Sequence, residues 1–251
     1  MPVKSLNLVI DHRLSARLDI PVDNKVLGYA IISHCFTCSK ETLTTARVSR
    51  GLARLGFAVV RFDFTGLGES NGEFADSNFT SMVQDIESVA QFMEHHYQPP
   101  DMLIGHSMGG TASLVAAAEI PSCKTIVTIA SPSTPQHVLH HFGTALPELD
   151  AGRTSKIKVA GNDYPIKPQF IQDVRGYPIE NMHNHLSIPI LVIRAGQDEL
   201  VKSEDADEIS EYTRDVSKII DFPDADHLFS NRNTTESMIN QIADWYQHLD
   251  N

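Results

Sequence analysis

The feature that most limits the fold of this chain is the alternation of short apolar runs with amphipathic stretches of helical length. The runs are rich in β-branched residues, as expected of strands buried in a largely parallel sheet. They cover residues 6–10, 15–20, 28–36, 57–64, 101–107, 125–131, 188–196 and 217–223, and the first two flank a polar turn typical of a hairpin. Apolar residues recur three and four positions apart over 79–93 and 236–249, which predicts helices. We therefore expect an α/β fold with a mainly parallel eight-stranded sheet flanked by helices.

One segment, roughly residues 132–187, interrupts the alternation. It contains prolines, five histidines and a Gly-Asn-Asp turn between the short runs 156–159 and 164–167, which predicts a hairpin. Because it follows the run 125–131, it would lie above the carboxyl ends of the strands. We expect a single domain over residues 1–251, with 132–187 as a small cap or lid insert, since 251 residues suit one large domain.

Charge and cysteine content limit the partners and the compartment. A net charge of -12 argues against binding nucleic acid or an anionic membrane surface. The apolar run from Leu6 to Ile10 is too short for a signal sequence or a membrane span, so a cytoplasmic location is the default. The cysteines, Cys35, Cys38 and Cys123, are odd in number and do not resemble a secreted disulfide framework, so we expect reduced thiols. These features leave open whether the chain forms a homo-oligomer.

The most informative motif lies where the run 101–107 ends and a helical stretch begins. Residues 105–109 read Gly-His-Ser-Met-Gly and fit the pattern G-x-S-x-G. The glycines leave room for a sharp strand-to-helix turn, which would hold the hydroxyl of Ser107 out at the top of the sheet beside a helix N-terminus. The same letters also fit a glycine-rich helix start, so the case for Ser107 as a nucleophile depends on its partners.

A serine hydroxyl is a weak nucleophile that needs a base, and the base needs a carboxylate to orient it. Asp198 follows the seventh apolar run and His227 follows the eighth, so both are expected on loops at the carboxyl ends of strands, where sites gather in parallel sheets. The order Ser107, Asp198, His227 is that of α/β-hydrolases and not that of chymotrypsin or subtilisin. Other carboxylates close enough in sequence to serve as the acid are Glu199, Asp224 and Asp226.

A tetrahedral intermediate also needs N–H groups placed where its oxyanion forms. One is expected to be the backbone amide of Met108, directly after the nucleophile. The second should come from the loop that follows the run 28–36, and the amide of Phe36 is the first choice, with Cys35 and Thr37 as neighbours that would also serve.

Four segments carry a more specific resemblance: "HCFTCSKE", "VVRFDFTGLGESNGEFADSNFTS", "LIGHSMGG" and "DADHLF". They resemble the hydrolase half of bacterial proteins in which an α/β-hydrolase is fused to an OsmC-like domain, and the resemblance covers nearly the whole chain. It implies an α/β-hydrolase fold and a serine hydrolase mechanism, with Ser107, Asp198 and His227 at the triad positions. The chain ends at Asn251 with no OsmC-like domain after it, so we do not expect peroxide-reducing activity.

Two further patterns point to other classes of function. Cys35 and Cys38 form C-x-x-C, a spacing found in redox pairs and in half of a zinc site, but no second C-x-x-C completes a metal site. Histidines in the cap, together with Glu148 or Asp150, would suit a metal, although such residues more often line a surface; they are His137, His140, His141, His183 and His185. We expect no metal.

Taken together, the residues predict a cytoplasmic serine esterase that acts on a small-molecule carboxylic ester of short to medium acyl or aryl type. The reaction would use Ser107, Asp198 and His227 and would need no cofactor. A thioesterase, an amidase or a carbon–carbon hydrolase on the same triad is the alternative, since a fold does not fix its substrate. A thiol redox protein that uses Cys35 and Cys38, or a non-catalytic binding scaffold, would be the alternative from another class.

Overall fold

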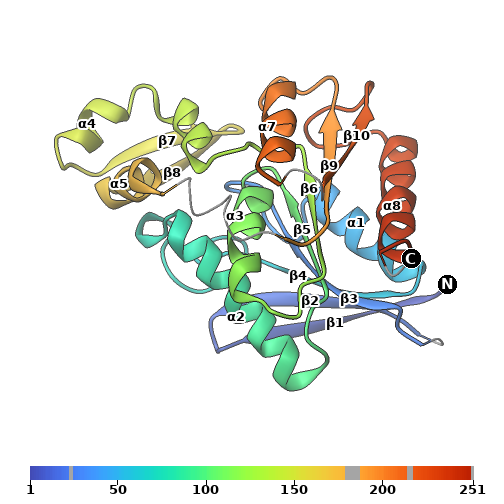
Figure 1. Cartoon of the computed structure of the whole chain (residues 1–251). Helices are drawn as coiled ribbons and strands as arrows, with labels where there is room; N and C mark the ends of the chain where they lie inside the picture. Colours follow the sequence, from blue (N-terminus) through green and yellow to red (C-terminus); the bar gives the residue numbers. More distant parts are fainter. Residues whose placement is uncertain (23–24, 179–186, 214–216, 250–251) are drawn as a thin grey trace.

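The structure is a computed structural model of the chain, and it describes residues 1–22, 25–178, 187–213 and 217–249. The strands of its central sheet are β1 (Val3–Ile10), β2 (Leu14–Pro21), β3 (Gly28–Ser33), β4 (Phe57–Phe62), β5 (Met102–His106), β6 (Thr125–Ile129), β9 (Ile190–Ala195) and β10 (Ser217–Phe222). Their order is β1-β2-β4-β3-β5-β6-β9-β10 (Figure 1). The pairs β1–β2 and β2–β4 are antiparallel and the other pairs are parallel, which confirms the mainly parallel eight-stranded sheet.

The predicted strand over 28–36 is shorter in the structure. β3 ends at Ser33, and Phe36 and Thr37 form a turn in which Thr37 has a left-handed backbone conformation, with φ of 59°. A strand cannot continue through a residue in that conformation. The three predicted residues that follow β3 therefore belong to a loop above the sheet.

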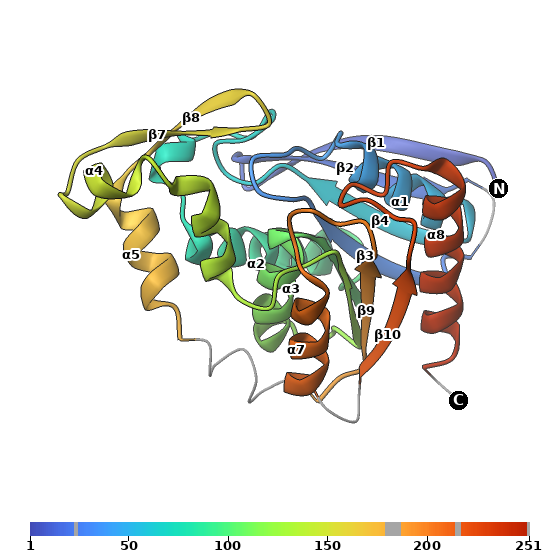
Figure 2. The same cartoon turned by 90° about the horizontal axis from the view of Figure 1, so that it is seen from above.

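Helices cover both faces of the sheet. α1 (Leu43–Arg54) and α8 (Arg232–Gln247) lie on one face, and α2 (Phe79–His96), α3 (Met108–Ala116) and α7 (Ser203–Thr213) lie on the other (Figures 1 and 2). Short 3-10 turns occupy Phe74–Asp76 (η1) and Ala117–Glu119 (η2). The predicted helices over 79–93 and 236–249 correspond to α2 and α8. Each face buries its own apolar cluster, as expected where the central strands are buried on both faces.

Between β6 and β9 the chain forms elements outside the main sheet, which we call the cap elements. They are η3 (Pro135–Phe142), α4 (Leu146–Asp150), β7 (Ser155–Val159), β8 (Asn162–Ile166) and α5 (Pro168–Gly176), and Figure 2 shows them together on one side of the molecule. β7 and β8 pair as an antiparallel hairpin. The hydroxyl of Tyr164 on β8 donates to the carbonyl oxygen of Thr37 at 3.1 Å, which joins the hairpin to the loop after β3. The predicted cap, 132–187, includes residues 179–186, which lie outside the described residues.

Buried charges join the loops that follow β3 and β4. The ammonium of Lys40 lies 2.5 Å from the carboxylate of Asp63, and both side chains are almost fully buried. The backbone N–H of Lys40 also donates to Asp63 at 2.6 Å, and the guanidinium of Arg61 donates to the carbonyl oxygen of Lys40 at 2.8 Å. Because a buried charge is costly without its partner, these bonds fix the two loops relative to each other.

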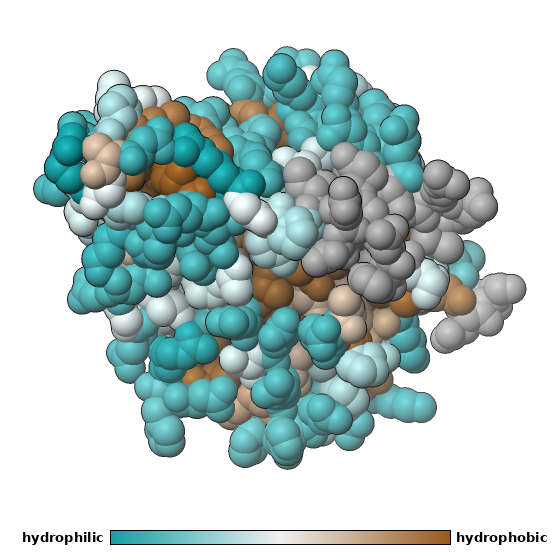
Figure 3. Space-filling model, turned by 60° about the vertical axis from the view of Figure 1, so that its left-hand side comes forward, coloured by the Kyte–Doolittle hydropathy of each residue, from teal (hydrophilic) through white to brown (hydrophobic). Residues whose placement is uncertain are grey.

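The face on which the cap elements lie is mostly hydrophilic, with separate hydrophobic areas between polar residues (Figure 3). Among the helices that the structure describes, none combines the length and the apolar character that crossing a bilayer requires.

Three glycines let the turn between β5 and α3 pack closely. A Cβ at Gly105 would lie 2.3 Å from the Gly109 carbonyl oxygen, and one at Gly109 would lie 2.4 Å from the carbonyl oxygen of His34. At Gly110 it would lie 1.9 Å from the hydroxyl of Ser131. Real Cβ atoms do not approach other heavy atoms so closely, so the turn packs in this way only with glycine at these positions, and it is Gly109 that lets the N-terminus of α3 lie against the end of β3.

We expect Gly109→Ala to destabilise the protein by about 1–3 kcal/mol through overpacking against the backbone of His34. Helix propensity alone would favour alanine at this position by about 1 kcal/mol, so the two effects have opposite signs. Gly176→Ala is the matched control, because a Cβ at the end of α5 meets no atom within 4 Å. Denaturant unfolding measures both variants; a stable Gly109→Ala protein would show that the close contact is not rigid.

Candidate active site

Ser107 lies on the turn between β5 and α3 with φ of 54° and ψ of -130°. An L-residue in this region costs about 1–3 kcal/mol and needs support from its surroundings. The support is present: the N–H of Ser107 donates to the carbonyl oxygen of Ile129 at 2.9 Å, and its own carbonyl accepts from the N–H of Gly110 at 2.8 Å. The turn therefore holds a partly exposed serine at the start of a helix, as G-x-S-x-G predicts.

His227 and Asp198 form a buried pair on neighbouring loops. Nδ1 of His227 donates to Oδ2 of Asp198 at 2.7 Å, and the two side chains are 11% and 2% exposed. Oδ1 of Asp198 accepts from the N–H groups of Leu200 and Val201 at 2.8 and 2.9 Å. Burial alone would raise the pKa of Asp198, but the hydrogen bonds and the nearby imidazole outweigh it, so the pKa lies below its usual value. Asp198 is therefore an anion that orients His227 through Nδ1 and leaves Nε2 as the basic nitrogen.

The other candidate acids are engaged or exposed. The carboxylate of Asp226 accepts from the N–H of Ser230 at 2.8 Å and from the hydroxyl of the same residue, so it caps its own loop. Glu199 and Asp224 are exposed side chains. Of these four carboxylates, only Asp198 is bonded to His227 among the described residues.

A cavity of about 680 Å³ brings the predicted residues together. Ser107 and His227 both line it, together with Met108 and Phe36. The rest of the lining is largely apolar or aromatic and includes Val138, His141, Val159, Tyr164, Leu200 and Leu228. Apolar walls around a few polar groups are typical of small-molecule sites.

The residues of both predicted oxyanion donors line this cavity. Met108 is the first residue of α3, so its N–H has no acceptor within the helix and carries the partial positive charge of the helix start. Residues 35–38 form a turn in which the N–H of Cys38 donates to the carbonyl oxygen of Cys35 at 3.1 Å. The N–H of Phe36 takes no part in that bond.

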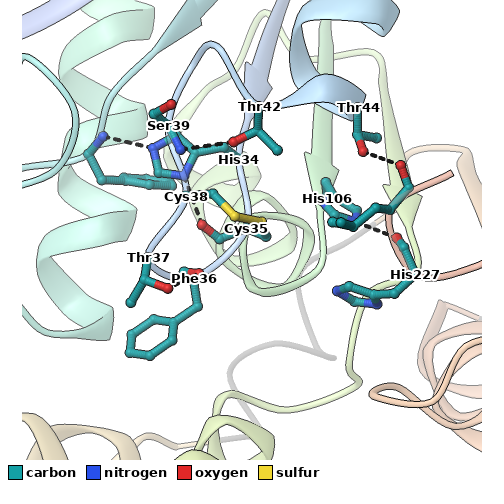
Figure 4. Close-up of a disulfide and its surroundings, with 12 residues drawn as sticks. His34, Cys35, Phe36, Thr37, Cys38, Ser39, Thr42, Thr44, His106 and His227 are labelled. Carbon is teal, nitrogen blue, oxygen red and sulfur yellow. Dashed lines mark hydrogen bonds between the residues drawn. A yellow bond between two sulfur atoms is a disulfide. The ribbon is translucent and has the colours of Figure 1, made fainter. Parts of the chain in front are cut away.

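The prediction of reduced thiols is wrong for two of the three cysteines. Cys35 and Cys38 form a disulfide in the loop after β3 (Figure 4), and Cys123 is free and buried. The prediction used the odd number of cysteines and the expected compartment. It could not include the turn, which brings the two Cα atoms to 5.3 Å, a normal disulfide separation.

His34 supports the same loop from below. It is fully buried, and its Nδ1 donates to the carbonyl oxygen of Cys35 at 2.8 Å, while Nε2 accepts from the N–H of Phe64 at 3.2 Å. Burial lowers the pKa of His34 to about 4, so the ring is neutral and can donate and accept at once.

His106 was not identified from the sequence as a site residue. Its ring is fully buried, and Nε2 donates to the backbone carbonyl of His227 at 2.7 Å (Figure 4). Burial, with the neighbouring imidazole of His227, lowers the pKa of His106 to about 3. Its Nδ1 has no hydrogen-bond partner among the described residues. The one signal in the sequence is an imidazole within an otherwise apolar strand, directly before Ser107.

Three cap histidines, His137, His140 and His141, line the cavity. The rings of His140 and His141 have centroids 3.8 Å apart, and His141 stacks on Phe36 at 6.1 Å. Burial and the adjacent imidazoles lower the pKa of His141 to about 4. Within the part of the chain that the structure describes, no cluster of three or more ligating side chains could hold a metal ion, and His183 and His185 lie outside it.

Comparison with known proteins supplies a family and a fold. Residues 32–172 match the family described as serine aminopeptidase, S33. The monoglyceride lipase of Rattus norvegicus is 26% identical over 230 residues, which cover 78% of this chain and 75% of that protein. The crystal structure of the esterase domain from a Rhodothermus marinus protein is 31% identical with a TM-score of 0.75 and covers 98% of both chains. Est1E from Butyrivibrio proteoclasticus with bound ferulic acid is 21% identical with a TM-score of 0.80, covering 97% of this chain and 98% of that one. These neighbours confirm the α/β-hydrolase fold.

The buried histidines predict a pH dependence of stability. His34 and His106 stay neutral in the folded chain down to about pH 4 and about pH 3, whereas an ordinary histidine takes up a proton near 6.5. Between these values the unfolded chain binds more protons, so stability is full above about pH 6.5 and is lost as the pH falls. We expect Tm to drop by about 5 °C or more between about pH 7 and 4.5.

His106→Gln tests the origin of that drop, because glutamine keeps an N–H donor and does not titrate. Its Tm should fall less steeply with pH than that of the unaltered protein in scanning calorimetry. Equal slopes would mean that His106 does not contribute to the acid sensitivity.

Proposed function

The chain belongs to the serine aminopeptidase S33 family of α/β-hydrolases and is a serine hydrolase, and from that premise we propose that it hydrolyses carboxylic esters through Ser107. The observation that carries the proposal is the buried Asp198–His227 pair, bonded at 2.7 Å, whose histidine lines the same cavity as a serine on a strained strand-to-helix turn. A serine with a base and an orienting carboxylate at the wall of an apolar cavity is equipped for acyl transfer.

In the proposed mechanism, Nε2 of His227 takes the proton of Ser107 as the hydroxyl attacks the ester carbonyl. Asp198 holds the imidazole through Nδ1 and stabilises its charged form. The backbone amides of Met108 and Phe36 donate to the oxyanion, and the alcohol leaves with the proton from His227. Water then attacks the acyl group on Ser107 by the same steps and releases the acid.

The proposed substrate is an ester of short to medium acyl or aryl type. A cavity of about 680 Å³ suits a drug-sized molecule, and its aromatic walls suit a ring or a short chain. The ferulic acid bound to Est1E supports an aryl group as one candidate. A thioester, an amide or a carbon–carbon bond remains the alternative target of the same residues.

We further propose a cytoplasmic location, no nucleic-acid or membrane partner, and a relationship to the hydrolase half of α/β-hydrolase–OsmC fusions. A cap over residues 132–187 is likewise part of the proposal.

Substitutions should distinguish the three proposed catalytic residues from neighbouring residues by their effect on kcat. Ser107→Ala and His227→Ala are each expected to lower kcat for p-nitrophenyl butyrate by about 10⁴ to 10⁶, since such residues act as a unit. Asp198→Asn should cost up to about 10⁴ because it disturbs the tautomer of His227. The control is Asp226→Asn, which should keep activity within about tenfold. Loss with Asp226→Asn and retention with Asp198→Asn would identify Asp226 as the acid.

Acyl length should be limited by the cavity. Across p-nitrophenyl esters, kcat/KM is expected to peak at roughly two to eight acyl carbons. Val159→Trp, which adds bulk to the cavity wall, should move the optimum to shorter chains, whereas Val9→Trp on β1, where Val9 is 66% exposed, should leave it unchanged. An optimum at long-chain esters, or the same shift in both variants, would contradict this substrate class.

A further inference from the structure

The disulfide between Cys35 and Cys38 lies at the catalytic cavity. Both cysteines line the cavity that contains Ser107, and Phe36, the proposed second oxyanion donor, lies between them in sequence. Cys35 is 5% exposed and Cys38 is partly exposed. The crosslink therefore closes a turn of four residues around a group that the proposed reaction needs, and a small reagent can reach it from the cavity.

The backbone of this turn is unfavourable by itself. Thr37 has φ of 59°, a left-handed conformation that β-branched residues rarely adopt. One backbone hydrogen bond closes the turn, from the N–H of Cys38 to the carbonyl oxygen of Cys35 at 3.1 Å. Without a further restraint, Thr37 would relax toward negative φ, and the peptide units on either side of Thr37 would rotate with it. The next unit, between Cys35 and Phe36, carries the Phe36 N–H and lies within the same four-residue turn.

The other contacts of the loop hold it less directly. Nδ1 of His34 donates to the carbonyl oxygen of Cys35, and the Tyr164 hydroxyl donates to that of Thr37. The ring of Phe36 packs among aromatic rings of η1 and of the cap elements η3 and α5. The hydroxyl of Thr37 also donates to the carbonyl oxygen of Phe36 at 2.7 Å. These contacts fix the side chain of Phe36 and three carbonyl groups, whereas the disulfide joins both ends of the turn covalently.

We infer that Cys35 and Cys38 are a positioning pair, whose disulfide holds the Phe36 N–H where the oxyanion forms. The oxidised protein is then the efficient hydrolase, and its dithiol form is a poorer one. The inference rests on the proposed function, since it assigns the pair a part in ester hydrolysis and not in thiol chemistry.

Reduction by a dithiol reagent such as dithiothreitol converts one form into the other. The reagent supplies two electrons and two protons, the bond between the sulfurs of Cys35 and Cys38 breaks, two thiols form, and the reagent closes into its own cyclic disulfide. Removal of the reagent and addition of oxidised glutathione reverses the exchange.

The first test compares kcat and KM for p-nitrophenyl butyrate in the two forms. Because the Phe36 N–H is displaced and not removed, we expect reduction to lower kcat by about three- to tenfold, less than the 10² to 10³ of a deleted donor. KM should change by less than about twofold, since ground-state contacts remain. The variant with Cys35→Ser and Cys38→Ser should have the kcat of the reduced form, and the dithiol should not change it. The Cys123→Ala variant should lose kcat on reduction as the unaltered protein does. An unchanged kcat, or a change confined to KM, would overturn the inference.

Hydrogen–deuterium exchange of the segment 34–42 provides a readout that does not depend on ester turnover. The amides of residues 35–38 should exchange faster after reduction, while those of α3 stay unchanged. Equal exchange in both forms would overturn the inference even where hydrolysis proceeds through Ser107. Faster exchange in a protein that hydrolyses no ester in either form would instead contradict the proposed function.

Discussion

The close contact between the start of α3 and the end of β3 is the constraint on which the rest of the site depends. Gly109 can lie against the carbonyl groups of Ser33 and His34 only because it has no Cβ. This contact brings two separate loops to one place: the turn with Ser107 and the turn with Phe36. It also brings the start of α3 close to the loop after β3, so that the residues of the two proposed N–H donors, Met108 and Phe36, line the same cavity as Ser107. A bulkier helix start would separate them.

Buried polar contacts then hold the loops of the site in place. Two neutral imidazoles each hold a loop by a hydrogen bond to its backbone. His34 donates to the carbonyl oxygen of Cys35, and His106 donates to the carbonyl oxygen of His227. The ion pair of Lys40 and Asp63 adds a third link between loops distant in sequence. Both rings are neutral because a buried imidazolium would be costly. The carboxylate of Asp198 keeps its charge because it accepts three hydrogen bonds. The predicted acid sensitivity of the fold and the orientation of the proposed base thus share a physical cause.

The sequence predicted what depends on local pattern. Continuous apolar runs predicted the strands, and the position of Asp198 and His227 after two of them predicted their meeting, because parallel strands end at one edge of a sheet. It could not predict contacts that depend on loop conformation. Nothing near Cys35 and Cys38 indicated that Thr37 would take a positive φ and bring the two sulfurs together. His106 was missed for a similar reason, since its partner is a backbone carbonyl 121 residues away.

The central claim is that Ser107 is the nucleophile, activated by His227 and oriented from Asp198. The most direct measurement is treatment with a fluorophosphonate, followed by mass spectrometry of the digested protein, because only an activated serine beside an oxyanion hole reacts quickly with this reagent. The account predicts one phosphonyl group per chain, on the peptide that contains Ser107, and slow or no labelling in the His227→Ala protein. Labelling at another residue that persists in Ser107→Ala would contradict it.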